Sequence, residues 1–301
     1  MFWYVIAMLT YAIRLARTDD RSFRRVLLTE SPMLPTDLVL LSNDDGYASP
    51  GLEALRAAFS AHARTIVCAP EHEQSAMSHS LSLHRPLRLR SPSADVYAVD
   101  GTPADCVYVA LHATPLDASG TALEADPKRV LLPKLPRLVV SGINIGLNLG
   151  QDVFYSGTVA AAREAALRGI PSLAMSAHHR ADHEPIAELA VKLGRAIVAA
   201  SEKDGRPLLY NVNVPKNWNG KVKAARIGAR IYDQAVEFRT DPRGRDYLWL
   251  GGVGVHHEDD PGADTDAYDQ GFASLTPLAL ELTLHRELDR ANAIADEVSQ
   301  A

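Results

Sequence analysis

The sequence predicts an α/β fold with a mostly parallel sheet, and two observations carry the prediction. Short apolar runs without polar alternation recur along the chain, at Leu38–Leu41, Thr65–Cys68 and Leu138–Val140. Such runs are typical of parallel strands that are buried on both faces. Segments with helical spacing separate the runs, as expected for strand–helix–strand units. Each run ends in a polar segment, at the carboxyl end of a strand, where open α/β sheets bind ligands.

Capping signals predict where the helices begin. A hydroxyl N-cap followed by proline places helix starts at Ser49–Pro50 and at Thr102–Pro103, and Asp105 completes a capping box at the second. An alanine-rich helix is expected over Val159–Arg168, and an amphipathic helix over Pro185–Ala200.

The pattern changes after residue 215. We expect a strand at Ser172–Ser176 and the last strand of the core at Leu208–Val214. Beyond these, short alternating segments at 223–231, 247–250 and 272–284 are separated by Asp-Pro-Arg-Gly and Asp-Pro-Gly turns, which predicts β-hairpins. The chain therefore divides into an α/β catalytic core over 37–215 and a hairpin arm with a C-terminal segment over 216–301, which is expected to serve oligomerisation.

Composition limits the classes of function. The 301-residue chain has a formal net charge of −6, which argues against a nucleic-acid polymer as partner, because such a partner requires a basic face. Its two cysteines, Cys68 and Cys106, lie in apolar stretches, which suits a reducing compartment and predicts a cytoplasmic protein.

The first 36 residues are set apart from the regular pattern. Phe2–Ile13 is almost wholly apolar, but it is too short to span a bilayer, and no basic residue precedes it as in a secretory signal. Arg14–Arg25 is strongly charged. We expect an N-terminal extension outside the fold, with Met33 as the initiator of the folded part and no stable membrane association. A signal peptide or membrane anchor is the alternative.

Two adjacent carboxylates, Asp44 and Asp45, follow the first apolar run directly. Neighbouring carboxylates repel each other unless a cation lies between them, and Mg2+ or Mn2+ suits oxygen ligands. The segment therefore predicts a metal site. The alternative is a plain turn, because asparagine, aspartate and glycine are preferred in turns.

Two further polar segments offer ligands for an anion. Ser141–Gly150 is rich in glycine and carries Asn144 and Asn148, but its spacing matches neither a P-loop nor a dinucleotide-binding fingerprint. At Ser156–Thr158, two hydroxyls and free backbone N–H groups precede a helix, which favours a phosphate. A plain helix N-cap is the alternative for this second segment.

The histidines are weaker candidates. His79 lies in the polar segment Ser75–Ser80, where it can contact substrate or donate a proton, and a structural histidine is the alternative. The run His256–Asp260 and the pair His178–His179 are expected to be solvated, not metal-binding.

Taken in order, these motifs resemble those of the SurE family, the stationary-phase survival proteins. The resemblance covers roughly residues 37 to 284 and rests on Ser-Asn-Asp-Asp-Gly at 42–46, Ala-Pro-Glu at 69–71 with Ser75, Gly-Thr-Pro-Ala-Asp-Cys at 101–106, Ser-Gly-Ile-Asn at 141–144 and Tyr-Ser-Gly-Thr at 155–158. It implies a three-layer α/β/α, Rossmann-like, mostly parallel sheet with a C-terminal β-hairpin arm. It also implies a metal-dependent 5′/3′-nucleotidase.

The resemblance assigns site residues as well. One divalent ion per subunit, Mg2+ or Mn2+, would be held by Asp44, Asp45, Ser75 and Asn144. The phosphate pocket would comprise Asn148, Ser156, Gly157 and Thr158, and we add Asn43 and His79 as candidates for substrate binding. Family members exchange similar arms between subunits, which implies a homodimer or homotetramer. Gln74 departs from the pattern, because an arginine is frequent there, and this removes one positive charge near the substrate.

The expected reaction is hydrolysis of nucleoside 5′- and 3′-monophosphates, with short polyphosphate as a further substrate. The metal ion would activate a water molecule, Asp44 or Asp45 would act as general base, and Asn148 with the helix start at Ser156–Thr158 would stabilise the phosphate charge. Two alternatives stay open: attack by Asp44 itself to form an aspartyl-phosphate, and a nucleotide-binding sensor without turnover.

Overall fold

The structure is a computed structural model, and it describes residues 36–114, 121, 130–232, 236–250, 255–257 and 259–299. The expected N-terminal extension lies outside these residues, apart from Thr36. None of the helices within the described ranges has the length and apolar character that crossing a bilayer requires.

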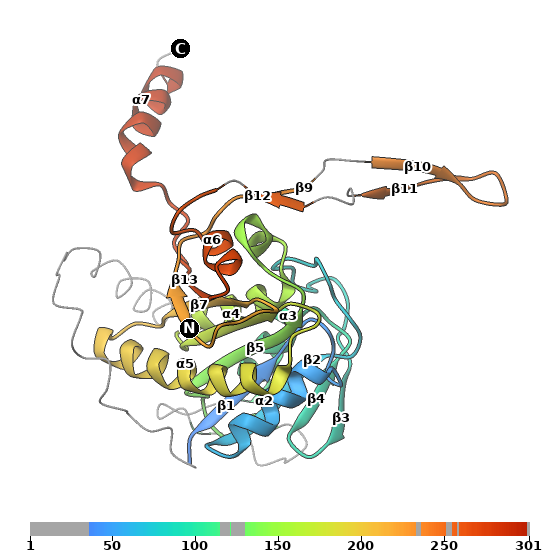
Figure 1. The fold of residues 1–301 in the computed structure, drawn as a ribbon, viewed down its shortest axis with the longest axis vertical. Coiled ribbons are helices and arrows are strands. Elements are labelled where there is room, and N and C mark those ends of the chain that lie inside the picture. The colour runs from blue at the N-terminus through green and yellow to red at the C-terminus, as the bar shows by residue number, and fades with distance from the viewer. Residues whose placement is uncertain are drawn as a thin grey trace.

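A nine-stranded sheet forms the centre of the molecule (Figure 1). Its strands are β1 (Leu38–Ser42), β2 (Arg64–Pro70), β3 (Leu89–Ser93), β4 (Val96–Val99), β5 (Leu138–Ile145), β6 (Ser172–Ala177), β7 (Leu209–Val214), β8 (Val222–Ala224) and β13 (Ala273–Pro277). They lie in the order β3-β4-β2-β1-β5-β6-β7-β13-β8. The strands from β4 to β7 are parallel, whereas β3 and β13 run antiparallel to β4 and β7. The mostly parallel sheet is as predicted.

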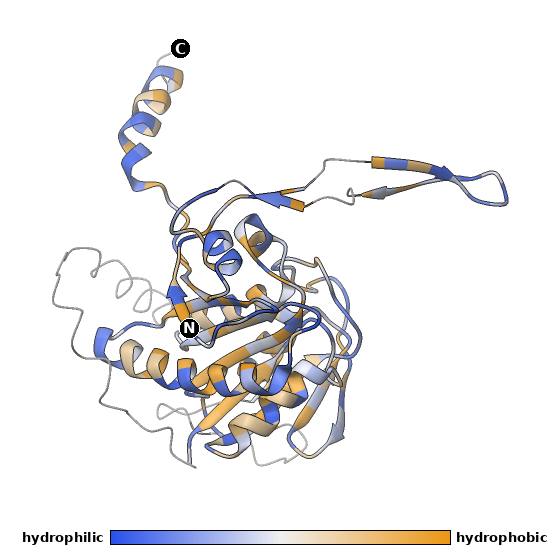
Figure 2. Cartoon of the chain, in the orientation of Figure 1, coloured by the Kyte–Doolittle hydropathy of each residue, from blue (hydrophilic) through white to orange (hydrophobic). Residues whose placement is uncertain are grey.

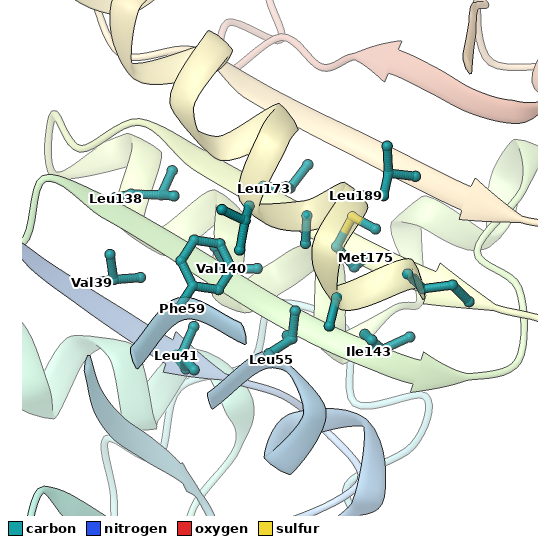
Figure 3. Close-up of a cluster of buried hydrophobic side chains, with 14 of the residues drawn as sticks. Val39, Leu41, Leu55, Phe59, Leu138, Val140, Ile143, Leu173, Met175 and Leu189 are labelled. Atoms are coloured by element: carbon teal, nitrogen blue, oxygen red, sulfur yellow. The ribbon is translucent and has the colours of Figure 1, made fainter. Parts of the chain in front are cut away.

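Helices cover both faces of the sheet. On one face, α2 (Pro50–Ser60) and α5 (His183–Asp204) pack against the odd-numbered apolar residues of β1, Val39 and Leu41. Figure 3 shows this cluster, with Phe59 and Leu55 of α2 beside the sheet. On the other face, α3 (Pro103–His112) and α4 (Gly157–Leu167) pack against the even-numbered ones, such as Leu40. Alternate side chains of a buried strand point to opposite faces, which is why the strands are apolar throughout.

The predicted helix starts are confirmed. The Ser49 hydroxyl accepts a hydrogen bond from the Leu52 backbone N–H, and Thr102 and Asp105 form both bonds of the capping box. Helix α4 begins at Gly157, two residues earlier than expected. Helix α5 is longer than expected at both ends, because Asp182 caps its start and the chain continues helically as far as Asp204.

The expectation that Leu208–Val214 is the last strand of the core is wrong. Strand β13 pairs antiparallel with β7, with Leu275 opposite Val212, and β8 pairs in turn with β13. The segment after residue 215 therefore contributes two strands to the same sheet. Its buried side chains include Ser274 and Thr276, so the segment lacks the apolar run that marks the other buried strands.

An arm leaves the sheet between β8 and β13. Strands β9 (Arg230–Tyr232) and β12 (Val255–His257) pair at its root, and β10 (Val236–Thr240) and β11 (Asp246–Leu250) form a projecting hairpin. The predicted Asp-Pro-Arg-Gly turn closes this hairpin, where the Gly244 N–H donates to the Asp241 carbonyl at 3.0 Å.

Three short helical elements and a C-terminal helix complete the described chain. They are η1 (Gly150–Phe154), α6 (Asp264–Asp269), η2 (His285–Glu287) and α7 (Leu288–Ser299). Helix α7 projects from the body of the molecule and has no buried residue. Figure 2 shows that hydrophobic residues gather on the central strands and also occur on the projecting hairpin and α7.

Candidate active site

Four separate segments meet at the carboxyl edge of the sheet. Strand β1 lies between β2 and β5, so the chain segments that follow these three strands emerge side by side. The Gln74 N–H donates to the Asp44 carbonyl at 2.8 Å, and the Ile145 N–H donates to Asp45 Oδ2 at 3.2 Å. The start of α4 completes the group, because the Thr158 N–H donates to Asp44 Oδ2 at 3.1 Å. Asp44, Asp45 and Thr158 therefore lie together, next to the segments that carry Ser75 and Asn144.

Asp44 is held tightly at this edge. Its side chain accepts hydrogen bonds from both the backbone N–H and the hydroxyl of Thr158, and the residue is only 5% exposed. A Cβ on Gly157 would lie 2.9 Å from both Asp44 Cβ and Pro103 Cγ, so only glycine allows α4 to approach this closely. Burial raises the pKa of Asp44 to about 6, with a further contribution from Asp45, while the bonds from Thr158 oppose the shift.

Asp45 is less enclosed than its neighbour. Burial is the largest cause that raises its pKa, and Glu73 adds to the shift. The Ile145 N–H and the nearby His183 oppose it. The site thus contains two neighbouring carboxylates whose charged forms are both disfavoured, chiefly by burial.

Asn43 supports the turn that carries the carboxylates. Its amide nitrogen donates to the Gly46 carbonyl at 2.9 Å and to the Ser49 hydroxyl at 2.7 Å. The segment is therefore a turn, as in the alternative interpretation. The side chain of Asn43 makes the bonds that stabilise this turn, so the turn does not prevent the two carboxylates from binding a metal ion. The oxygen Oδ1 of Asn43 is buried without a hydrogen-bond partner among the described residues.

Ser75 and Asn144 flank the carboxylates. The Ser75 hydroxyl is exposed and donates to Glu73 Oε1 at 2.7 Å, so its oxygen still has an acceptor lone pair. The amide nitrogen of Asn144 donates to the Gly146 carbonyl at 3.0 Å, which leaves its oxygen as the free end. Gly142 allows β5 to reach this position, since its φ is +131° and a Cβ would lie 2.2 Å from the Met175 carbonyl oxygen.

The donor set fits a hard divalent cation. Two carboxylates, a hydroxyl and an amide oxygen are all oxygen ligands, which Mg2+ and Mn2+ prefer over nitrogen or sulfur.

No group of three or more histidine, cysteine or acidic residues with metal-binding geometry occurs within the described ranges. In the arm, His257 is instead bonded to Asp269 at 2.5 Å, and the rings of His178 and His179 stack with centroids 4.2 Å apart.

The predicted phosphate residues are already engaged within the protein. The Ser156 hydroxyl accepts from the Val159 N–H at 3.0 Å, as in the N-cap interpretation, and both donors of Thr158 point to Asp44. In this structure Thr158 therefore orients a carboxylate. Its assignment to a phosphate pocket stays a prediction, as does that of Ser156 and Gly157.

Asn148 lies in a buried polar network that its sequence motif did not indicate. Its amide nitrogen donates to the Ser176 hydroxyl at 2.7 Å, and its backbone N–H donates to Asn213 Oδ1 at 2.7 Å. Its carbonyl accepts from Asn211 Nδ2 at 2.8 Å and from Asn213 Nδ2 at 3.1 Å. The two asparagines at alternate positions of an otherwise apolar strand, β7, were the signal that could have revealed this network.

The root of the arm also contacts the segment that links Asn148 to α4. Arg230 forms an ion pair with Asp152, and the Tyr232 hydroxyl donates to the same carboxylate at 2.6 Å. Burial and Asp152 together raise the pKa of Tyr232 to about 12. The buried Asp264 accepts from the Gly150 N–H at 3.0 Å. Residues after 215 thus complete the surroundings of η1.

Comparison with known proteins identifies the family. The family model described as "Survival protein SurE" matches residues 39–234. The chain belongs to the SurE family. It is 54% identical to the protein named 5′-nucleotidase SurE of Sorangium cellulosum over 265 residues, which is 87% of this chain and 97% of that protein. A protein of the same name from Anaeromyxobacter sp. (strain Fw109-5) is 47% identical, over 81% of this chain and 90% of its own length.

A solved SurE structure has the same fold. The crystal structure of the SurE protein from Aquifex aeolicus superposes with a TM-score of 0.69, at 35% sequence identity, over 86% of this chain and 99% of that chain. The predicted SurE-like architecture, with helices on both sides of a mostly parallel sheet and hairpins near the C-terminus, is confirmed.

Proposed function

We propose that this SurE protein is a metal-dependent nucleotidase that hydrolyses nucleoside 5′-monophosphates to nucleoside and phosphate. The observation that carries the proposal is the buried Asp44, fixed by the start of α4 beside a second carboxylate. The relatives named 5′-nucleotidase support this class of reaction. Nucleoside 3′-monophosphates and short polyphosphate are proposed as further substrates.

One divalent ion would be held by Asp44, Asp45, Ser75 and Asn144. When bound, it would polarise the phosphate and lower the pKa of a water molecule. Thr158 holds the Asp44 carboxylate in one orientation, so this ligand is preorganised. Asp44 or Asp45 would act as the general base that takes the proton of this water molecule.

The phosphate would lie against the start of α4. The positive end of the helix dipole faces this edge of the sheet and favours an anion. Asn148 is fixed by its bond to Ser176, so its side chain needs little ordering when substrate binds. The described residues form no arginine or lysine contact with Asp44 or Asp45 that would compete with substrate.

The first experiment measures phosphate release from a panel of 5′- and 3′-nucleoside monophosphates. EDTA should abolish release, and Mn2+ or Mg2+ should restore it, with nucleotides preferred over a generic aryl phosphate. Nucleotide binding without release under any metal would instead favour the sensor. A burst of product, or a phosphoenzyme trapped by acid quench, would favour the aspartyl-phosphate route.

We further propose that the protein assembles as a homodimer or homotetramer through its arm and C-terminal segment. One face of the β10–β11 hairpin carries the exposed apolar side chains of Val236, Phe238, Leu248 and Leu250, with Phe238 at 74% and Leu250 at 79%. Contiguous exposed apolar residues are typical of interaction surfaces. Light scattering should give a multiple of 32.7 kDa, and replacing Phe238 and Leu250 on this face by serine should lower the measured mass. The two free, buried cysteines suit a reducing, cytoplasmic environment.

A further inference from the structure

A buried carboxylate lies outside the proposed reaction. The side chain of Glu164, on α4, is 2% exposed and is enclosed between two partners. The ring of His79 lies with Nε2 at 2.9 Å from Glu164 Oε2, and Arg168 donates to Glu164 Oε1 at 2.9 Å. Burial alone would raise the pKa of Glu164, but these two partners outweigh it and lower the pKa. Glu164 is therefore charged at neutral pH and firmly bonded on both sides.

His79 belongs to the loop that carries Ser75. Within this loop Ala76 and Ser78 adopt positive φ angles of 59° and 52°, a conformation that is unfavourable for residues with a Cβ. Such a conformation persists only when the surroundings hold it in place. The loop must therefore be held by contacts on both sides of these two residues.

Hydrogen bonds from Ser78 and to Ser80 hold this part of the loop in place. The Ser78 N–H donates to the Tyr155 carbonyl at 2.9 Å, and its hydroxyl donates to the Phe154 carbonyl at 2.7 Å. Further along, the Thr102 hydroxyl donates to the Ser80 carbonyl at 2.7 Å. Between these contacts, His79 is tied to the interior by Glu164.

We infer that Glu164 is a positioning residue: through His79 it holds the loop from Ser75 to Ser80 in the conformation that places the Ser75 hydroxyl at the metal site. The inference rests on the proposed function, because it takes Ser75 as a ligand. It assigns His79 a role as an anchor, in place of a contact with substrate. Residues that orient a metal ligand from outside its coordination sphere commonly change metal affinity about 10-fold or more when they are replaced.

The test is Mn2+ binding to the full chain, measured by calorimetry without substrate, together with phosphate release at increasing Mn2+. Glu164→Leu removes the carboxylate at similar volume, and His79→Leu removes the anchor from the other side. Each should weaken Mn2+ binding about 10-fold, while saturating Mn2+ restores kcat to within a few-fold of the unsubstituted protein. Glu164→Gln, which keeps a hydrogen-bonding partner for His79, should lose less.

Arg168→Met is the matched control. It removes the other partner of the same carboxylate, at a side chain that is 38% exposed, without touching the loop. Its Mn2+ affinity should stay within about 2-fold of the original, because His79 remains bonded. If Glu164→Leu does not fold, the partly exposed His79→Leu gives the same comparison.

Two outcomes overturn the inference. One is unchanged Mn2+ affinity in both leucine variants, and the other is an equal loss in Arg168→Met. If the unsubstituted protein neither binds Mn2+ nor releases phosphate, the proposed function itself fails, and this result is distinct from the first two.

Discussion

Replacing Asp44 by asparagine should stabilise the metal-free protein at neutral pH while abolishing hydrolysis. The pKa of Asp44 is about 6 in the folded protein, against 3.8 for an ordinary aspartate. The folded state therefore binds this proton more tightly than the unfolded state, and the free energy of unfolding decreases as the pH rises from about 4 to about 6. The difference between the two pKa values is worth about 3 kcal/mol above pH 6.

An asparagine at this position fits the contacts of Asp44. Its oxygen accepts the Thr158 N–H, and its nitrogen can donate to the Thr158 hydroxyl, because a hydroxyl both donates and accepts. We expect a gain of about 1–3 kcal/mol at pH 8, since the neutral amide avoids the cost of a buried charge. A gain of this size corresponds to an increase in Tm of roughly 2–8 °C.

The assay is thermal unfolding of both proteins in EDTA at pH 8 and at pH 4.5. The gain should be largest at pH 8 and should shrink at pH 4.5, where Asp44 of the unsubstituted protein is protonated when folded. Asp45→Asn is the matched control, with a smaller expected gain because Asp45 is less buried. A variant that is less stable at pH 8, or a gain that does not change with pH, would refute the reasoning.

Three further substitutions test the surroundings of the site. Gly157→Ala should lower the free energy of unfolding by about 1–3 kcal/mol, because the new methyl group would collide with Asp44. The same collision should reduce phosphate release at least about 10-fold, and normal release would contradict this. Thr158→Val should raise the pKa of Asp44 further in the metal-free protein, since a hydrogen bond that lowers it is lost, and carboxyl 13C NMR titration would show the shift. Thr102→Ala should cost about 1–2 kcal/mol in urea unfolding by removing the α3 cap, whereas Thr102→Ser should retain most of that stability.

The features predicted best were those fixed by neighbouring residues. The helix starts at Ser49 and Thr102 depend on a hydroxyl, a proline and the next few backbone N–H groups, all of which are visible in the sequence. The buried strands were found for a similar reason, because burial on both faces leaves an uninterrupted apolar run such as Leu38–Leu41.

The features missed were those that depend on distant pairing. Strand β13 has polar side chains at Ser274 and Thr276 that are nevertheless buried, so its membership of the sheet follows from its pairing with β7 and not from its composition. Likewise, the sequence motifs singled out Asp44 and Thr158 separately. They did not indicate that the backbone N–H and the hydroxyl of Thr158 both donate to Asp44. That contact follows from how closely α4 packs against the turn after β1, which is a property of the folded molecule.

The pairing of β7 with β13 bears on how the protein is made by the ribosome. When the chain has been synthesised as far as Val214, one edge of β7 is still without its partner. Gly150 and Asp152 then also lack their partners, Asp264 of α6 and Arg230 at the arm root. An unpaired strand edge is prone to associate with other chains. The nascent protein is therefore expected to pass through a stage that is vulnerable to aggregation until residues 264–277 emerge, and the surroundings of η1 are complete only then.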